Sequence, residues 1–600
     1  MTLAIAAHSK LAAIAAACLL TVALPSSAMA QKIKTKSPPE APPQAEISKP
    51  EISVEIATID AVGSSVDEAT LRDMLSGSIV DNADALATLD ATSITVPTIA
   101  VSFSSMVDGE AKSGEAVIQD LVLDDVKDGV AGSVTLGGIE LTSNDDFSGS
   151  FGEISAKQFD IGGMLGIYGL VDAPDSTDLA VIYSDFAAEG GTIEAEDVSC
   201  TIGSMEVAEF SGRPLKSSFA DMMAVSQALE AEGDTPSPQT IGTFLHMYAD
   251  IFTAFKSSPF TFNGFDCSGK DETGAPLDFS IESASTDGMS PGIYPAVKME
   301  GLKIAVEGDG EVSVGNIAIK ATDLSGPIAL VEAAPAAIDQ AWFEANARAL
   351  VPAFGGFSFE DIKVDVPNPD AEGERIVASV GGFDLSLEDY FNGIPTAIAS
   401  SASHIVVDLP TDTADEQLQQ LINLGVTSVD IGYVLKAAWD EAADAIEVEE
   451  VSINGANLAS VALAGTIGNA TKALFDTNPD TALAAGMAVV IQNLKLDVVD
   501  EGLADIVLAS VAAEQGSDAA TMRPIFAGLA EGTIIGMLAG AAEAQNVGAA
   551  VSSFIKGEAK SLTIELTAKE EPGLGMADFM AAEQDPTVLI GKTNITATAK

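Results

Sequence analysis

Apolar and polar residues alternate with a period of two along most of this chain, and this pattern limits the fold to one built largely from β-strands. In the clearest example, Ile304 and Val306 alternate on one arm of a hairpin and Val312 and Val314 on the other, while residues 308–310 supply a Gly-Asp-Gly turn. Strands of this kind bury one face and expose the other, as in antiparallel sheets. The hairpin therefore predicts an antiparallel sheet with one solvated face.

The same alternation recurs from one end of the chain to the other. It predicts strands at 52–56, 94–96 and 562–566. A longer meander is expected over 428–466, with a turn near 440–444.

Helical spacing of apolar residues interrupts the strands. Residues 238–255 show this spacing directly after a proline, which favours a helix start. Thr413 and Glu416 form a capping-box pattern that predicts a second helix, ending at Gly425. The segment 500–556 is alanine-rich and apolar, and we expect it to form a packed helical layer.

Four segments share a glycine, an alternating strand and then a second glycine stop: 151–163, 202–214, 314–327 and 381–395. Their unequal intervals exclude a solenoid of fixed period. They indicate irregular strand–turn–helix repeats instead. The predicted fold class is therefore α+β and β-rich, an extended antiparallel sheet or meander built from these repeats, with an alanine-rich helical layer near the C-terminus.

Residues 1–30 have the parts of a cleavable secretory signal. An apolar run from Leu11 to Leu24 follows a start without acidic residues, and a small-x-small pattern ends at Ala30. We therefore predict cleavage between Ala30 and Gln31. The alternatives are an uncleaved anchor, although the run is shorter than the ~20 residues that a span needs, and lipoprotein processing at Cys18, although the apolar run continues past that residue.

Composition after the signal suggests the domain organisation. Residues 31–50 contain five prolines and three early lysines, and we expect them to be a disordered linker. The rest of the chain is long enough for two sizeable cores. We place an N-terminal β-rich domain with helices at 51–335 and a C-terminal α+β domain at 336–600.

The charge of the chain excludes two classes of partner. The formal net charge is −61, and removal of the signal, with its one lysine and no acidic residue, makes it −62. Such a chain repels nucleic acid and anionic lipid headgroups. Acidic pairs such as Asp124-Asp125 lack the spacing of a calcium loop and predict solvated turns.

Two cysteines, Cys200 and Cys267, remain after cleavage of the signal. Both lie in strand-like sequence. In an oxidising periplasm an isolated pair of this kind predicts a structural disulfide, with two free thiols as the alternative. The bridge would join residues 200–267 into one structural unit.

A search for catalytic or cofactor chemistry finds no motif. The mature chain has two histidines, His246 and His404, and neither has Cys, Asp or Glu at metal-ligand spacing. The sequence contains no nucleophile elbow, phosphate-binding loop or dinucleotide fingerprint. Trp342 and Trp439 lie far apart with no aromatic cluster around either, so we expect both to pack rather than bind sugar. The sequence therefore predicts no catalytic, metal or cofactor-binding residue.

The C-terminal half also resembles a known group of sequences. The residues that match are GERIVASVGGFDLSLEDYFNGIPT (373–396), ADEQLQQLINLGVTSVDIGYVLKAAWDE (414–441) and PGLGMADFMAAEQDPTVLIGKTNITATA (572–599). They are similar to an uncharacterised group of secreted alphaproteobacterial proteins, over roughly the last 250 residues. The resemblance implies export and a shared architecture, and it implies no activity.

Three classes of function remain. The first is an exported, non-catalytic protein of a Gram-negative envelope, periplasmic or extracellular, that binds an apolar ligand such as a lipid, or an envelope partner. The second is a structural protein of a surface assembly, which calcium-dependent association would favour. The third is a hydrolase without a recognisable motif. No transmembrane span is predicted in the mature chain.

The signal generates the first testable prediction. Mass spectrometry of the intact protein recovered from the envelope or medium of its own cells should give a chain that begins at Gln31. An Ala30→Leu change should slow this processing, because the peptidase requires a small residue at that position. Full-length protein retained in the cytoplasm would contradict the prediction of export.

Overall fold

The computed structural model describes residues 51–600 apart from short internal segments, of which the longest are 172–177, 369–374 and 410–418. The predicted cleavage site at Ala30–Gln31 and the linker 31–50 lie outside the described residues, as does most of the helix predicted from Thr413. The strands, in chain order, are β1 (Glu51–Ile56), β2 (Asp60–Val62), β3 (Ala91–Val107), β4 (Glu110–Val126), β5 (Val130–Leu136), β6 (Gly138–Ser143), β7 (Phe147–Phe151), β8 (Ile154–Asp160), β9 (Ala180–Ala188), β10 (Gly191–Ala195), β11 (Val198–Ile202), β12 (Met205–Gly212), β13 (Phe255–Ser257), β14 (Phe260–Phe262), β15 (Phe265–Lys270), β16 (Pro276–Ile281), β17 (Ser283–Thr286), β18 (Ile293–Tyr294), β19 (Val297–Val306), β20 (Gly310–Ile319), β21 (Thr322–Asp323), β22 (Ala353–Phe354), β23 (Gly356–Pro367), β24 (Arg375–Phe391), β25 (Ile394–Asp408), β26 (Ser428–Asp440), β27 (Ala445–Gly455), β28 (Ala459–Gly468), β29 (Val490–Asp500), β30 (Ser561–Ala568), β31 (Leu574–Gly575) and β32 (Thr593–Ala599).

Helices interrupt this series of strands at intervals. They are α2 (Glu68–Leu75), α3 (Ala83–Ala87), α4 (Ile161–Ile167), α5 (Phe219–Glu232), α6 (Pro238–Ile251), α7 (Ser325–Glu332), α8 (Gln340–Asn346), the 3₁₀ helix η1 (Lys472–Phe475), α10 (Pro479–Ala488), α11 (Leu503–Glu514), α12 (Ala519–Met537), α13 (Ala544–Lys556), α14 (Met576–Ala582) and α15 (Thr587–Lys592). The predicted β-rich α+β class with one extended antiparallel sheet is confirmed.

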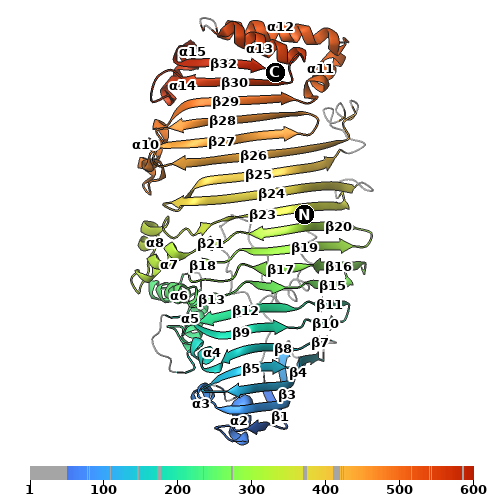
Figure 1. The fold of residues 1–600 in the computed structure, drawn as a ribbon, viewed down its shortest axis with the longest axis vertical. Coiled ribbons are helices and arrows are strands. Elements are labelled where there is room, and N and C mark those ends of the chain that lie inside the picture. The colour runs from blue at the N-terminus through green and yellow to red at the C-terminus, as the bar shows by residue number, and fades with distance from the viewer. Residues whose placement is uncertain are drawn as a thin grey trace.

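One sheet of 29 strands runs along the long axis of the molecule, from β1 and β2 at one end to β32 at the other (Figure 1). Between β4 and β19 this sheet is split into two arms. One arm contains β6, β7, β10, β11, β15 and β16, and the other contains β5, β8, β9, β12, β14 and β17. β4 pairs with both β5 and β6, and β19 with both β16 and β17, so the arms join at these strands. After β19, longer strands cross the full width of the sheet.

A line of kinks continues from the gap between the arms into the long strands. We call it the kink line and define it by Gly301, Gly315, Asp361, Gly381 and His404, which lie at the same level on β19, β20, β23, β24 and β25. Gly301, Asp361 and His404 have φ values of 66°, 53° and 49°. A Cβ at Gly315 would lie 2.9 Å from that of Asp361, and one at Gly381 would lie 3.0 Å from that of His404. Close approach therefore requires glycine on alternate strands.

A left-handed residue also changes the phase of the apolar alternation on β4, where the two arms of the sheet join. In β4, Asp120 has a φ of 49°. Ile118 and Leu121, one on each side of Asp120 in the sequence, pack against the same buried cluster. In a regular strand these two side chains would point to opposite faces. The left-handed residue therefore keeps the apolar side chains of both halves of the strand on one face.

Close approach at glycines explains the sequence repeat. Each of the four repeated segments has a glycine at or next to its first residue that another part of the chain approaches closely: Gly152 and Gly203, where the chain crosses between the arms, and Gly315 and Gly381, on the kink line. The first three copies lead, after their strands, to α4, α5 and α7, as the strand–turn–helix prediction requires. The fourth copy contradicts it. There Asn392 and Gly393, with φ values of 49° and 72°, turn the chain directly from β24 into β25.

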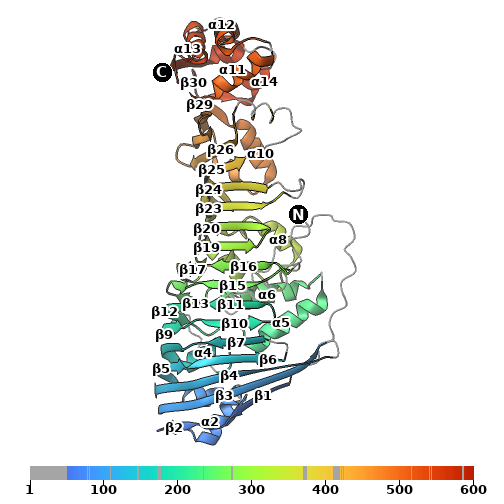
Figure 2. The ribbon, with the colours of Figure 1, turned by 90° about the vertical axis from the view of Figure 1, so that its right-hand side faces the viewer.

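The helices gather at one end of the strands, as Figure 1 shows for α4 to α8 and α10. Figure 2 shows α5, α6, α8 and α10 on one side of the sheet. The first end of the sheet is packed against α2, α3 and α4 in the largest buried cluster. The other end meets α13, which contacts β30 and β32. Helices thus cover both ends of the sheet but only part of its length.

Most other predicted elements are confirmed. The hairpin of β19 and β20 turns at residues 307–309, and the meander over 428–466 forms β26, β27 and β28. The helix expected over 238–255 ends at Ile251, because the chain then turns into β13. Helices α11 to α13 occupy 500–556, but α12 is not packed all round, since Ile525 and Leu529 are exposed.

The proposed boundary between residues 335 and 336 falls between α7 and α8. β20, before this boundary, pairs with β23, after it, from Glu311 to Ile319. The division into two domains stays a prediction.

The kink line generates the second prediction. We expect Gly315→Ala to lower the free energy of unfolding by roughly 1–3 kcal/mol, the usual cost of overpacking, because the new Cβ would lie 2.9 Å from the Cβ of Asp361. Gly528→Ala in α12 is the control, since nothing lies within 4 Å of its Cβ and alanine favours a helix. Urea unfolding followed by circular dichroism measures both. Equal loss of stability in the two variants would contradict the kink-line argument.

Candidate binding surface

Two rows of side chains cross the sheet from β19 to β30 on one face, with each residue directly opposite its neighbour in the register. We call these rows the apolar ladder. The first row is Met299, Ile317, Phe359, Phe383, Ala402, Tyr433, Ile453, Val461, Val498 and Leu562, and the second is Val297, Ile319, Phe357, Leu385, Ser400, Leu435, Val451, Leu463, Leu496 and Ile564. Ring contacts among Phe357, Phe359 and Phe383 confirm that these side chains share a face.

The ladder is uncharged over its whole length. Strands in a sheet lie about 4.8 Å apart, so ten strands give the ladder a length of roughly 40 Å. The opposite face of the same strands has mostly small, polar or charged residues, such as Lys436 opposite Glu450 on β26 and β27. On β27 and β28, for example, Ser452 pairs with Ala462 and Asn454 with Ser460. This is the pattern of an antiparallel sheet with one solvated face.

The middle of the ladder is open to solvent. Leu435, Val451, Ile453, Val461 and Leu463 are 38%, 42%, 57%, 37% and 36% exposed. We call these five residues, on β26, β27 and β28, the open patch. The three buried clusters found in the described part of the chain contain none of them. A contiguous exposed apolar patch on a polar protein is typical of a binding surface.

An aromatic cluster borders the ladder face at the helix end of the strands. Trp439, two positions beyond Ala437 on the ladder face of β26, has its ring centroid 4.6 Å from that of Phe475 and 5.6 Å from that of Phe391. Its indole nitrogen donates to the carbonyl oxygen of Ala470 at 2.5 Å. Trp439 packs as predicted, but the expectation that it has no aromatic cluster around it is wrong. Phe391 and Phe475 are too distant in sequence to be recognised as its neighbours.

A second border lies at the C-terminal end. Leu562, the last residue of the first row, is 6% exposed. Helix α13 contacts its strand, β30, and the next strand, β32. The ladder is thus covered at β30 and open at β26 to β28.

One polar pair interrupts the apolar ladder. The Ser400 and Tyr433 hydroxyl oxygens lie 3.1 Å apart, and either can be the donor. Both side chains are half-buried, on β25 and β26 beside Leu435. No catalytic carboxylate or imidazole lies in either row, so the pair offers hydrogen bonding without an evident reaction.

The structure brings together the two cysteines for which the sequence predicts a bridge. Cys200 on β11 and Cys267 on β15 are directly opposite in the register, with their Sγ atoms 1.96 Å apart. They are 1% and 2% exposed and lie in a cluster with Ile193 and Phe265. The bridge therefore fixes two strands of one arm to each other within an apolar core.

The two histidines lie on different elements, His246 on α6 and His404 on β25, and neither belongs to the open patch. His246 has its Nδ1 atom 2.8 Å from the carbonyl oxygen of Gly242 in the same helix. His404, on the kink line, has its Nδ1 atom 3.1 Å from an Asp430 carboxylate oxygen, with a side chain 73% exposed. In the described residues, no three His, Cys, Asp or Glu side chains are grouped closely enough to bind a metal ion. Trp342 packs on α8 beside the buried cluster of α6 and α7.

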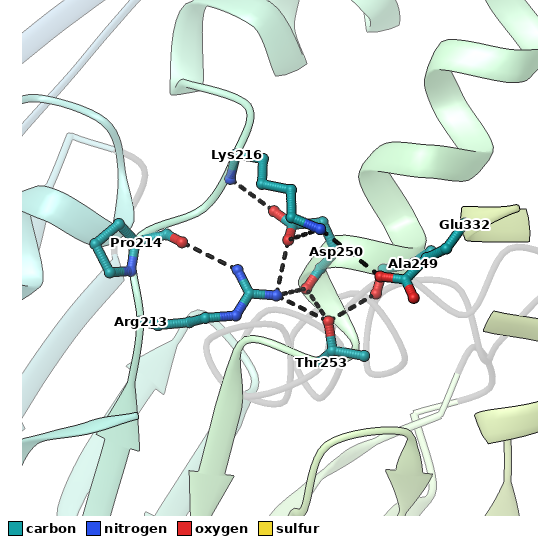
Figure 3. Close-up of polar contacts among 7 residues, drawn as sticks. All are labelled: Arg213, Pro214, Lys216, Ala249, Asp250, Thr253 and Glu332. Carbon is teal, nitrogen blue, oxygen red and sulfur yellow. Dashed lines mark hydrogen bonds and ion pairs between the residues drawn. The ribbon is translucent and has the colours of Figure 1, made fainter. Parts of the chain in front are cut away.

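A buried ion pair lies outside the ladder. Arg213, just after β12, is within 2.8 Å of Asp250 on α6, and the two side chains are 8% and 4% exposed (Figure 3). The Arg213 guanidinium also donates to Thr253 at 2.8 Å, and the backbone N–H of Lys216 donates to Asp250 at 2.7 Å. The partners of this pair lie on the connection after β12, on α6 and in the turn that follows α6. The cluster therefore anchors α6 to the sheet.

Comparisons with known proteins identify one match. A family model described as "Uncharacterized protein" matches residues 452–600, which include β28 to β32 and the helices between them. The match fits the predicted resemblance to an uncharacterised group in its C-terminal part. No curated protein and no solved structure matches the chain. In the described part of the chain, no helix combines the length and apolar character that a membrane span requires.

The anchor generates the third prediction. Asp250→Asn should lower the free energy of unfolding by roughly 3–5 kcal/mol, because it leaves the buried Arg213 guanidinium without its counter-charge. Lys216→Ala is the control, since the Lys216 side chain is 66% exposed and its ion pairs are long, at 3.7 Å. Thermal unfolding of the two variants measures the difference. Equal thermal unfolding midpoints for Asp250→Asn and Lys216→Ala would contradict the anchoring role of the Arg213–Asp250 pair.

Proposed function

We propose that this protein is an exported, non-catalytic envelope protein that binds the acyl chain of a lipid along the apolar ladder. The open patch is the observation on which the proposal rests. It consists of five large apolar side chains, contiguous in the register and each more than a third exposed. Leaving such a surface in water costs free energy in proportion to its area, and covering it with an acyl chain recovers that cost.

The shape of the ladder supports a chain-like ligand over a compact one. The rows run across the strands without a charged residue, so a flexible hydrocarbon can lie on them for several strands. The aromatic cluster of Phe391, Trp439 and Phe475 limits the surface on the helix side. The polar opposite face keeps the same strands soluble.

The proposed location in the envelope rests on sequence and on the cysteine pair. The predicted signal over 1–30 and the resemblance to secreted alphaproteobacterial proteins support export. A buried Cys200–Cys267 disulfide suits an oxidising compartment such as a periplasm or the extracellular space.

A structural role in an assembly is the second candidate. It is favoured by α12, whose exposed face has Ile525, Leu529 and Met537 at 57%, 64% and 63% exposure. A partner could cover that face. Nothing at the open patch requires such an assembly, so the two candidates concern different surfaces.

Native mass spectrometry with lipid extraction, on protein purified from its own envelope, separates the two candidates. Bound lipid at a defined stoichiometry supports the proposed function. Ligand-free protein that forms a discrete or calcium-dependent oligomer supports the structural alternative instead.

The open patch generates the fourth prediction. A Val451→Thr/Ile453→Thr/Val461→Thr variant should bind a pyrene-labelled acyl lipid at least about tenfold more weakly, since each change removes apolar contact area. Threonine keeps the β-branched shape that strands prefer. The matched control is Ser460→Thr/Ala462→Thr on the opposite face of β28. Fluorescence titration measures both, and equal affinities would contradict the assignment of the patch.

A further inference from the structure

We propose that the Ser400–Tyr433 hydroxyl pair binds the carbonyl oxygen of a neutral acyl ester, so that the ligand of the ladder is an ester lipid. This inference rests on the proposed function and specifies its ligand. The two hydroxyl oxygens are 3.1 Å apart on a surface that is otherwise apolar from β19 to β30. They are the only hydroxyl groups in the two rows of the ladder.

Of the two hydroxyl hydrogens in the Ser400–Tyr433 pair, one stays available to bond to a ligand. Each hydroxyl has one hydrogen and can also accept. The bond between Ser400 and Tyr433 uses one of the two hydrogens. Among the described residues no further acceptor is within bonding distance of either oxygen. In the uncovered protein, water can take this hydrogen, because both side chains are half-buried.

Covering the open patch removes that water. Tyr433 stands directly opposite Ile453 in the register, and Ser400 stands opposite Leu435, so an acyl chain on the patch also covers the pair. A donor left without an acceptor in an apolar contact is costly. A ligand that supplies a carbonyl oxygen at this position avoids the cost, whereas a plain hydrocarbon does not. A site of this kind discriminates against analogues that lack the acceptor.

The surroundings determine the direction of the chain. The aromatic cluster at Trp439 lies on the helix side of the patch, and α13 lies at the far end over Leu562. From the hydroxyl pair, the exposed apolar surface extends across β27 and β28 through Ile453 and Val461. We therefore place the ester at β25 and β26 and the acyl chain across β27 and β28.

The net charge of the protein distinguishes between neutral and anionic ligands that contain a carbonyl group. The mature protein has a formal charge of −62. Its potential opposes a free carboxylate, which an ester lacks. Neutral acyl esters are therefore favoured over fatty acids as well as over hydrocarbons.

Three pyrene-labelled probes of equal chain length test this inference on the mature full-length protein. They are a fatty acid methyl ester, the free fatty acid and the corresponding alkane. The wild type should bind the ester about three- to tenfold more tightly than the alkane, the ratio that one neutral hydrogen bond supports. A Ser400→Ala/Tyr433→Phe variant, which has neither hydroxyl, should lose this preference and bind the alkane more tightly, because no donor is then left without an acceptor. Tyr390→Phe is the control, because the Tyr390 hydroxyl donates to the carbonyl oxygen of Phe354.

The outcomes separate this inference from the proposed function. Loss of ester preference in Ser400→Ala/Tyr433→Phe but not in Tyr390→Phe supports it. Equal binding of ester and alkane by the wild type, or an ester preference that survives in Ser400→Ala/Tyr433→Phe, overturns it and leaves acyl-chain binding standing. Tighter binding of the free acid than of the ester also overturns it. Absence of binding by all three probes overturns both proposals.

Discussion

Close approach of neighbouring strands along the kink line is the constraint on which the rest of this sheet depends. At Gly315 and Gly381 the neighbouring strand leaves no room for a Cβ, so these glycines favour a single register of β20 with β23 and of β24 with β25. A shift by one residue would bring a side chain into that space and would move the apolar set of the strand to the solvated face. The register of the first part of the ladder, from β20 to β25, is therefore fixed at the kink line.

The elements could be predicted from the sequence because their signals are local. Alternation identified β19, β20 and the meander of β26 to β28, and the repeats pointed to the glycines of the kink line. The ladder could not be predicted, because it depends on which strands are neighbours and in which register. Ile319 and Phe357, for instance, face each other although two helices and two short strands separate them in sequence. Phe391 and Phe475 escaped recognition as neighbours of Trp439 for the same reason.

The position of the helices determines where the ladder stays open. The repeats deliver their helices to one end of the strands, on the side where Phe475 meets Trp439. The fourth repeat has a tight turn at Asn392–Gly393 in place of a helix. The fourth repeat therefore places no helix between β24 and β25. The open patch lies on the three strands that follow, β26 to β28.

The two halves of the molecule are stabilised by different means. The first half has three buried clusters, a disulfide and the Arg213–Asp250 anchor, whereas no residue beyond Leu350 belongs to any of these clusters in the described chain. Beyond Leu350 the buried apolar residues include Phe475 in the aromatic cluster and Val547 and Leu562 at the C-terminal end, whereas the open patch between them relies on cross-strand pairing. A ligand on the ladder would bury the apolar surface that this half leaves exposed, and any ligand that binds only the folded state stabilises it by mass action. In the proposed function, lipid binding and the stability of the second half are therefore coupled.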